Sequence, residues 1–118
     1  MILLVSATQL EVQSLLPETS KLQLGVPFPV DFYKNIKTEL LITGVGSVST
    51  SFFLARAIET KKYSLVINIG IAGSYVSSIQ IGEVVLVTDD VFADFGVDDR
   101  NSFIPAHQSG LLEPNEFP

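Results

Sequence analysis

Short, continuous apolar runs recur along the chain, and each has the length of a β-strand. They cover residues 2–5, 39–42, 63–69 and 83–88, and the last run extends through residue 93. Unbroken apolar runs are typical of strands that are buried on both faces of a sheet. We therefore predict four strands of a central sheet that is mostly parallel or mixed.

Apolar positions at helical spacing follow two of these runs. Residues 10–16 predict a helix that ends at Pro17, and Thr8 and Glu11 have the spacing of a capping box at its start. Residues 47–60 predict a second helix, which follows a glycine-rich turn. Strands that alternate with helices predict an α/β fold.

Weaker patterns fill the rest of the chain. Residues 22–26 and 30–33 predict two strands of a hairpin or meander at one end of the sheet. The periodicity fades at about residue 96, so residues 96–118 are expected to form an irregular tail. We expect a single domain over residues 1–118.

The composition excludes several classes of protein. Of the 118 residues, 47% are hydrophobic and 17% are charged, which excludes a disordered chain. The absence of cysteine excludes disulfide scaffolds, cysteine-ligated zinc and thiol nucleophiles. The length fits one domain, but it is short for an enzyme that buries a large parallel sheet.

Charge is uneven and argues against two kinds of partner. Residues 1–82 hold six Lys or Arg and five Asp or Glu, whereas residues 83–118 hold eight acids and one Arg. No basic patch is available for a nucleic-acid backbone. The first apolar run is too short for a membrane span or a signal sequence. We expect a cytoplasmic protein that binds neither nucleic acid nor a membrane.

Ligands of open α/β sheets bind beyond the carboxyl ends of the strands, and three loops fit that place. They are residues 6–11, 43–47 and 68–74. The G-x-G in the second loop lacks the third glycine of a dinucleotide fingerprint, and a tight strand-to-helix turn explains it better. The glycines of the third loop allow either a tight loop or close approach of a flat ligand. Glu11 could cap the first helix or act as a general base.

Metal sites are not indicated. The acids between residues 89 and 99 lack the spacing of a calcium loop, and His107 is the only histidine. We expect no metal and no cofactor.

Five segments of the chain form a recognisable set: ILLVSATQLEVQSLL, LITGVGSVSTSFFLARAI, YSLVINIGIAGSY, IGEVVLVTDDVFADFGVDD and GLLEPNEFP. Together they resemble the purine nucleoside phosphorylase/uridine phosphorylase superfamily and, within it, the futalosine hydrolases. The resemblance implies a three-layer α/β/α sandwich that hydrolyses the N-glycosidic bond of a purine-type nucleoside, with Glu11 contacting the attacking water. It places the ribose- and base-lining positions on Thr43, Gly44, Val45, Ile71, Ala72 and Gly73.

The resemblance also bears on the alternatives. Methylthioadenosine/S-adenosylhomocysteine nucleosidases tend to have a serine where Ile71 stands, which favours futalosine. Phosphorolytic members hold phosphate with an arginine where Asn68 and Ile69 stand, which favours water. The family's leaving-group acid lies in a C-terminal half that this chain does not match, so we expect a truncated domain that is inactive alone. A methylthioadenosine-type nucleosidase and a non-catalytic binding domain remain alternatives. The family commonly forms homo-oligomers.

Overall fold

The computed structural model describes residues 1–17 and 20–110, and the chain divides into two compact units. The first unit, Met1–Tyr75, contains a four-stranded sheet. The second, Val76–Pro118, contains a two-stranded sheet. In the described part of the chain, no helix combines the length and the apolar character needed to cross a membrane.

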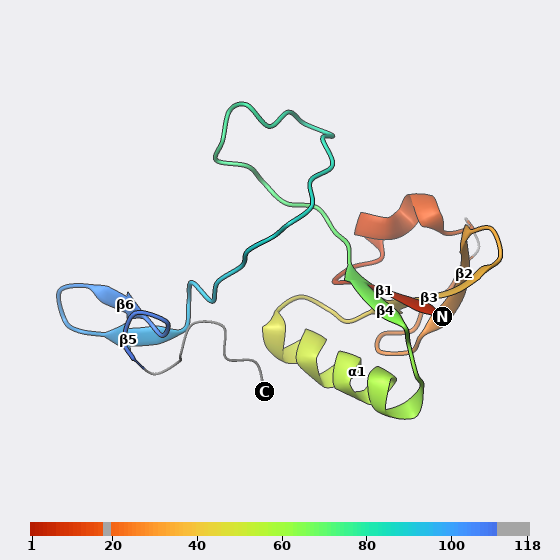
Figure 1. Ribbon diagram of the computed structural model, residues 1–118, viewed down its shortest axis with the longest axis horizontal. Helices are drawn as coiled ribbons and strands as arrows, with labels where there is room; N and C mark the ends of the chain where they lie inside the picture. The colour runs from red at the N-terminus through yellow and green to blue at the C-terminus, as the bar shows by residue number, and fades with distance from the viewer. Residues whose placement is uncertain (18–19, 111–118) are drawn as a thin grey trace. The chain divides into compact units, whose positions relative to one another are not determined.

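The four-stranded sheet is mixed, as predicted (Figure 1). Its strands are β1 (Ile2–Ser6), β2 (Phe28–Tyr33), β3 (Ile36–Ile42) and β4 (Leu65–Asn68), in the order β2-β3-β1-β4. β1 runs parallel to β3 and to β4, and β2 is antiparallel to β3. The carboxyl ends of the three parallel strands therefore meet at one edge of the sheet, which is the edge where ligands bind in open α/β folds.

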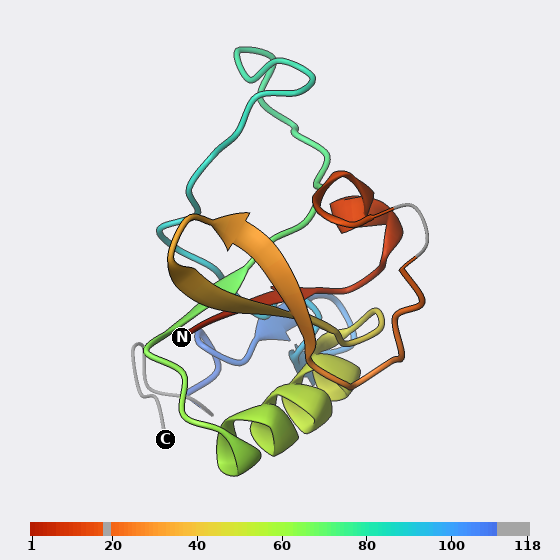
Figure 2. The same ribbon diagram turned by 90° about the vertical axis from the view of Figure 1, so that its right-hand side faces the viewer.

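Helical segments cover both faces of this sheet, as Figure 2 shows. Because successive side chains of a strand point to opposite faces, neighbouring leucines of β1 and β3 enter different clusters. Leu3, Val5 and Leu41 pack with Ala57 of α1 (Ser47–Thr60). The opposite face packs around η1 (Leu10–Leu15), through a cluster formed by Leu4, Val12, Leu16, Val30, Leu40 and Ile42.

These helical segments differ in how well the sequence predicted them. The bounds of α1 are those expected from the apolar spacing, and the helix follows Gly46, whose φ is +99°. The first helix is instead a six-residue 3₁₀ helix, and the non-helical dihedrals of Val12 kink it. The mixed sheet fits a phosphorylase-type α/β fold, and the full three-layer sandwich stays a prediction.

The segment before the hairpin corrects another expectation. Residues 22–26 form no strand. Gly25 has a φ of +72°, its N–H donates to the carbonyl of Ile42 at 2.8 Å, and the Phe53 ring fills the place that a Cβ would take. A turn packed this closely on α1 cannot continue as a strand. The neighbouring prediction is confirmed by β2.

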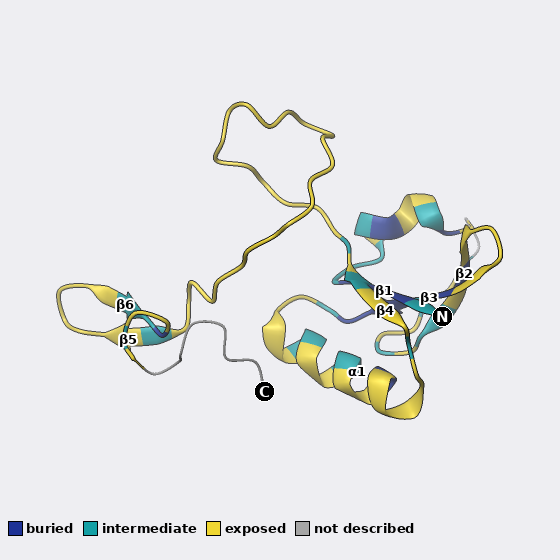
Figure 3. Cartoon of the chain, viewed as in Figure 1, coloured by how far each residue is buried: buried dark blue, intermediate teal, exposed yellow. Residues whose placement is uncertain are grey.

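The second unit overturns the prediction of a strand over residues 83–88 and its extension to residue 93. These residues pair with no strand, and their apolar side chains are exposed, as the burial colours show (Figure 3). A strand needs a ladder of hydrogen bonds to a neighbour, and apolar composition alone does not supply one.

The prediction of an irregular tail is wrong for part of its length. β5 (Gly96–Asp98) pairs with β6 (Phe103–Pro105) in antiparallel fashion, and Ala106 beside them is buried. Strands of three residues are too short to show alternation in the sequence. Residues 111–118 of the expected tail lie outside the described residues.

Candidate active site

The three loops that the sequence singled out start at the same edge of the sheet. The N–H of Thr43 donates to the carbonyl of Ser6 at 3.0 Å, and the N–H of Gly44 donates to the carbonyl of Ala7 at 3.0 Å. The N–H of Ile69 donates to the carbonyl of Val5 at 2.8 Å. These bonds extend the parallel ladders past the last strand residues and fix the start of each loop relative to β1.

Glu11 lies in η1, and its two carboxylate oxygens have different surroundings. Oε2 accepts hydrogen bonds from the Thr8 N–H at 2.7 Å, the Thr8 hydroxyl at 2.9 Å and the Ser6 hydroxyl at 3.2 Å. Oε1 accepts one long hydrogen bond, from the Ile71 N–H at 3.5 Å. The side chain thus links the first loop to the third, across sixty residues of sequence.

These donors keep the carboxylate ionised. The Thr8 N–H and then the Thr8 hydroxyl lower the pKa of Glu11 most, and the Ile71 N–H and Ser6 hydroxyl lower it further. Burial opposes them without cancelling their effect on the pKa. Hydrogen bonds to the charged form stabilise it, so Glu11 is an anion at neutral pH without any cation beside it in these contacts.

The capping interpretation is confirmed in part. The Glu11 carboxylate accepts the N–H of Thr8, which is one half of a capping box. The Thr8 hydroxyl, however, donates to the same carboxylate and makes no cap hydrogen bond to the helix backbone. The two hydrogen bonds from Thr8 therefore hold the Glu11 carboxylate in place, and the one from the Thr8 N–H also caps the helix.

Thr43 is enclosed by its own turn. The residue is 1% exposed, and its hydroxyl lies 3.4 Å from the Ser6 carbonyl, 3.1 Å from the Gly44 carbonyl and 3.1 Å from the Thr50 hydroxyl. The hydroxyl therefore ties the turn to β1 and α1. The surface of this turn is formed instead by Val45, which is 79% exposed.

The third loop is open to solvent. Ile71 is 80% exposed, and Ala72 and Gly73 are also exposed. Of the six positions expected to line a ligand, Ile71 is the one that contacts Glu11 among the described hydrogen bonds, through its backbone N–H. Val45, Ala72 and Gly73 have accessible surface at the same edge of the sheet.

A comparison with known families identifies the fold family. The family model for the phosphorylase superfamily matches residues 2–118, which is nearly the whole chain. The chain belongs to the phosphorylase superfamily. Its members are nucleoside phosphorylases and nucleosidases, so the chain comes from a family of enzymes that process the glycosidic bonds of nucleosides. No solved structure matches it.

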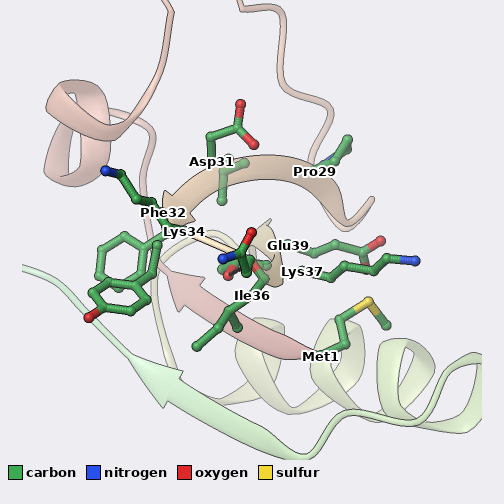
Figure 4. Close-up of a pocket in the computed structure, with 12 residues that line it drawn as sticks. Met1, Pro29, Asp31, Phe32, Lys34, Ile36, Lys37 and Glu39 are labelled. Atoms are coloured by element: carbon green, nitrogen blue, oxygen red, sulfur yellow. Dashed lines mark hydrogen bonds between the residues drawn. The ribbon is translucent and has the colours of Figure 1, made fainter.

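The four-stranded sheet also borders a hollow of about 1010 Å³ (Figure 4). This hollow lies at the end of the sheet opposite Glu11 and the three loops. It is lined by residues of β2, by residues 34–39 and by Met1. Met1 directly precedes β1 and Ile36 begins β3, so the hollow adjoins the amino ends of these strands. Glu11 and all three loops lie instead at the carboxyl end of these strands.

Glu39 also lines that hollow, and it is held by different partners from those of Glu11. Lys61 donates to its Oε1 at 2.5 Å, and the hydroxyl of Tyr63 donates to its Oε2 at 2.6 Å. Burial raises the pKa of Glu39, but the hydrogen bonds from Lys61 and Tyr63 and the Lys61 charge outweigh burial and lower it. Each oxygen of this carboxylate accepts one short hydrogen bond.

Sequence reasoning missed two residues of the Glu11 site. Ser6 ends β1 and is fully buried, and its hydroxyl contacts Oε2. Gly70 lies so close to Glu11 that a Cβ there would be 3.0 Å from Oε1. A polar residue at the end of a buried strand was the available signal for Ser6, whereas the role of Gly70 depends on a contact between distant segments.

Within the described ranges 1–17 and 20–110, no three His, Cys, Asp or Glu side chains are grouped so that they could hold an ion. The donors around Glu11 are neutral hydroxyl and amide groups, which bind an anion such as its carboxylate.

Proposed function

We propose that the chain forms part of a nucleosidase that hydrolyses the N-glycosidic bond of a purine-type nucleoside, with futalosine as the favoured substrate. The observation that carries this proposal is the carboxylate of Glu11. It lies at the ligand-binding edge of a phosphorylase-superfamily sheet, with one oxygen bound by three donors and the other bound by one long contact.

The proposed reaction is dissociative. The bond between the anomeric carbon and the base nitrogen breaks, the electron pair leaves with the base, and the ribose gains oxocarbenium character. The anion of Glu11 stabilises this positive charge and aligns a water molecule. The water oxygen bonds to the anomeric carbon and passes a proton to Glu11, while an acid protonates the leaving base. The products are the free base and a ribosyl group with an anomeric hydroxyl.

Water is the proposed acceptor because the three loops offer no cationic side chain that would hold phosphate. Residues 6–11, 43–47 and 68–74 contain neither Lys nor Arg. A phosphate dianion would therefore approach the ionised Glu11 without a compensating cation, whereas a neutral water is attracted by the carboxylate.

The proposed substrate contacts lie at the same edge of the sheet as Glu11. We propose that the base and ribose lie against the two loops beside Glu11, where Ile71 offers an exposed apolar side chain in place of a polar one. The family resemblance gives this position its weight, because methylthioadenosine-type nucleosidases tend to have a serine there, and the isoleucine therefore favours futalosine. The proposed lining positions are Thr43, Gly44, Val45, Ile71, Ala72 and Gly73. Thr43 is 1% exposed, so its proposed part is to support this lining from behind.

The test measures both products. Futalosine is incubated with the 118-residue chain and, in parallel, with the polypeptide encoded by the complete reading frame, because the leaving-group acid is not among the residues identified. Hypoxanthine and the sugar product are quantified with and without phosphate. We expect hypoxanthine and the free sugar at a rate that phosphate does not increase, from the complete polypeptide. A phosphate-dependent ribosyl 1-phosphate would refute hydrolysis, and faster adenine release from methylthioadenosine would reassign the substrate.

Assembly and location are further parts of the proposal. We propose a cytoplasmic homo-oligomer that uses no cofactor. Sedimentation velocity over a concentration series tests the oligomer, and a single monomeric species at all concentrations would refute it.

A further inference from the structure

The surroundings of Glu11 show which of its oxygens is free to act. An ionised carboxylate oxygen accepts about two hydrogen bonds along its lone pairs. Oε2 already has three donors within 3.2 Å, whereas Oε1 has one donor at 3.5 Å. Any added water therefore finds its acceptor at Oε1, on the side of residues 70 and 71.

The donors to Oε2 come from the last residue of β1 and from the segment that follows it. Ser6 is fully buried and ends β1, and Thr8 offers both its N–H and its hydroxyl to the same oxygen. The Ser6 hydroxyl has one proton and also lies 3.2 Å from the Thr8 carbonyl, so its bond to Oε2 is shared. Thr8 is therefore the principal anchor, and Ser6 supports it.

We propose that Thr8, supported by Ser6, is the positioning residue that fixes Oε2 of Glu11 and so leaves Oε1 to align the attacking water. This inference rests on the proposed function, because it assigns a task to each oxygen of the residue that the proposal makes catalytic. Neither Thr8 nor Ser6 needs to touch the substrate. They restrict the rotation of the carboxylate, and this restriction maintains the near-attack geometry of the water.

Gly70 completes the arrangement from the other side. A Cβ at this position would lie 3.0 Å from Oε1 and 3.5 Å from the carboxyl carbon of Glu11. The backbone of Gly70 does not have a positive φ, so alanine would not be strained there by its dihedrals. A methyl group would instead push on Oε1, which makes Gly70→Ala a probe of carboxylate position that keeps every donor to Oε2. At Gly73 of the same loop, a Cβ would meet nothing within 4 Å.

The principal test removes one hydroxyl and preserves shape. Thr8→Val deletes the hydroxyl donor to Oε2, Thr8→Ser restores it, and Thr60→Val deletes an exposed hydroxyl of α1 as a matched control. In the isotope-labelled 118-residue chain, NMR follows the Glu11 carboxyl carbon and the Ile71 amide against pH. We expect Thr8→Val to move both midpoints to higher pH, Thr8→Ser to return them, and Thr60→Val to leave them unchanged.

Kinetics supply a readout that a purely structural role would not change. In the form that releases base in the assay above, Thr8→Val should lower kcat by about tenfold to a hundredfold with KM nearly unchanged, since misplaced groups cost rate and not affinity. Gly70→Ala should also lower kcat. Thr8→Ser should recover most of the lost rate.

The outcomes separate this inference from the proposed function. Unchanged midpoints in Thr8→Val would overturn the positioning role even if base is released normally. Absence of base release from every form would refute the proposed function, and the NMR midpoints would still decide whether Thr8 anchors Glu11. If Thr8→Val fails to fold by circular dichroism, Ser6→Ala and Gly70→Ala decide instead, and unchanged Glu11 and Ile71 signals in both would overturn the inference.

Discussion

Glu11 and Glu39 lie toward opposite ends of one four-stranded sheet, and the pKa of each is lowered by a different set of neighbours. Neutral N–H and hydroxyl groups bind Glu11, mainly through one oxygen. A lysine and a tyrosine bind Glu39, with one donor on each oxygen. Both carboxylates are therefore ionised at neutral pH, but the charge of Glu39 alone is neutralised by a cation.

The difference separates a carboxylate suited to chemistry from one suited to structure. A charge held by neutral dipoles remains available to a developing cation or to a water molecule. The charge of Glu39 is instead paired with Lys61, and its short hydrogen bonds join β3 to the segment after α1. The contrast between these two residues can be tested with matched substitutions.

The largest expected effect is on catalysis. Glu11→Gln keeps the shape of the side chain but removes the charge and the proton acceptor, so base release should fall by about 10²- to 10⁴-fold. Glu39→Gln, the same change at the other end of the sheet, should leave base release within about twofold of wild type. Initial rates of hypoxanthine formation check both. Equal losses in the two variants would remove the distinction between the carboxylates.

A second effect concerns the titration of Tyr63. Burial, followed by the hydrogen bond to Glu39 and the Glu39 charge, raises the pKa of Tyr63 above its ordinary value of 10.0. We expect the Tyr63 hydroxyl to stay protonated at pH 10. The stabilising contribution of its hydrogen bond to Glu39 is therefore present below that pH and disappears as pH rises through the folded-state pKa of Tyr63. Glu39→Gln should move the NMR midpoint of Tyr63 downward, whereas Glu11→Gln should not move it.

A smaller effect is expected on stability. Tyr63→Phe removes a hydrogen bond to a partly exposed carboxylate and should lower the free energy of unfolding by about 1 kcal/mol. The pKa of Glu39 is depressed, so this cost should be present above about pH 4.5, the ordinary pKa, and should be lost as pH falls through the folded-state pKa. Urea unfolding at pH 7 and at acid pH checks this, and an equal cost at both would contradict it.

The smallest effect belongs to the ion pair. The side chains of Lys61 and Glu39 are 46% and 13% exposed, so Lys61→Met should cost no more than about 1 kcal/mol. Added salt should reduce that cost, because salt screens exposed charges. Urea unfolding in low and high salt measures it. The titration midpoint of Glu11 is set by neutral donors, so added salt should leave it nearly unchanged.

The parts of the fold that depend on local pattern could be predicted. Residues 47–60 carry a helical spacing that a glycine turn precedes, and α1 has those bounds. The apolar composition of residues 83–88 could not show whether they form a strand, because strand formation depends on a partner that the apolar pattern does not specify. The 3₁₀ form of η1 and its kink at Val12 could not be predicted, because apolar spacing does not distinguish a short 3₁₀ helix from an α-helix.

The candidate site divides in the same way. Glu11 and Thr8 could be found because their spacing is a local motif. Gly70 could not be linked to Glu11, because that contact arises only when β4 is placed beside β1. Thr43 was expected from the family resemblance, but only the folded turn shows that its hydroxyl is enclosed by backbone and by Thr50.

The central claim is that Glu11 is held as an anion by neutral donors, with Oε1 facing the Gly70–Ile71 loop. The most direct test is the pH titration of the Ile71 amide by NMR in wild type and in Glu11→Gln. We predict a single transition with a midpoint below 4.5 in wild type, and no such transition in Glu11→Gln. A wild-type midpoint at or above 4.5, or the same transition in both proteins, would contradict the account.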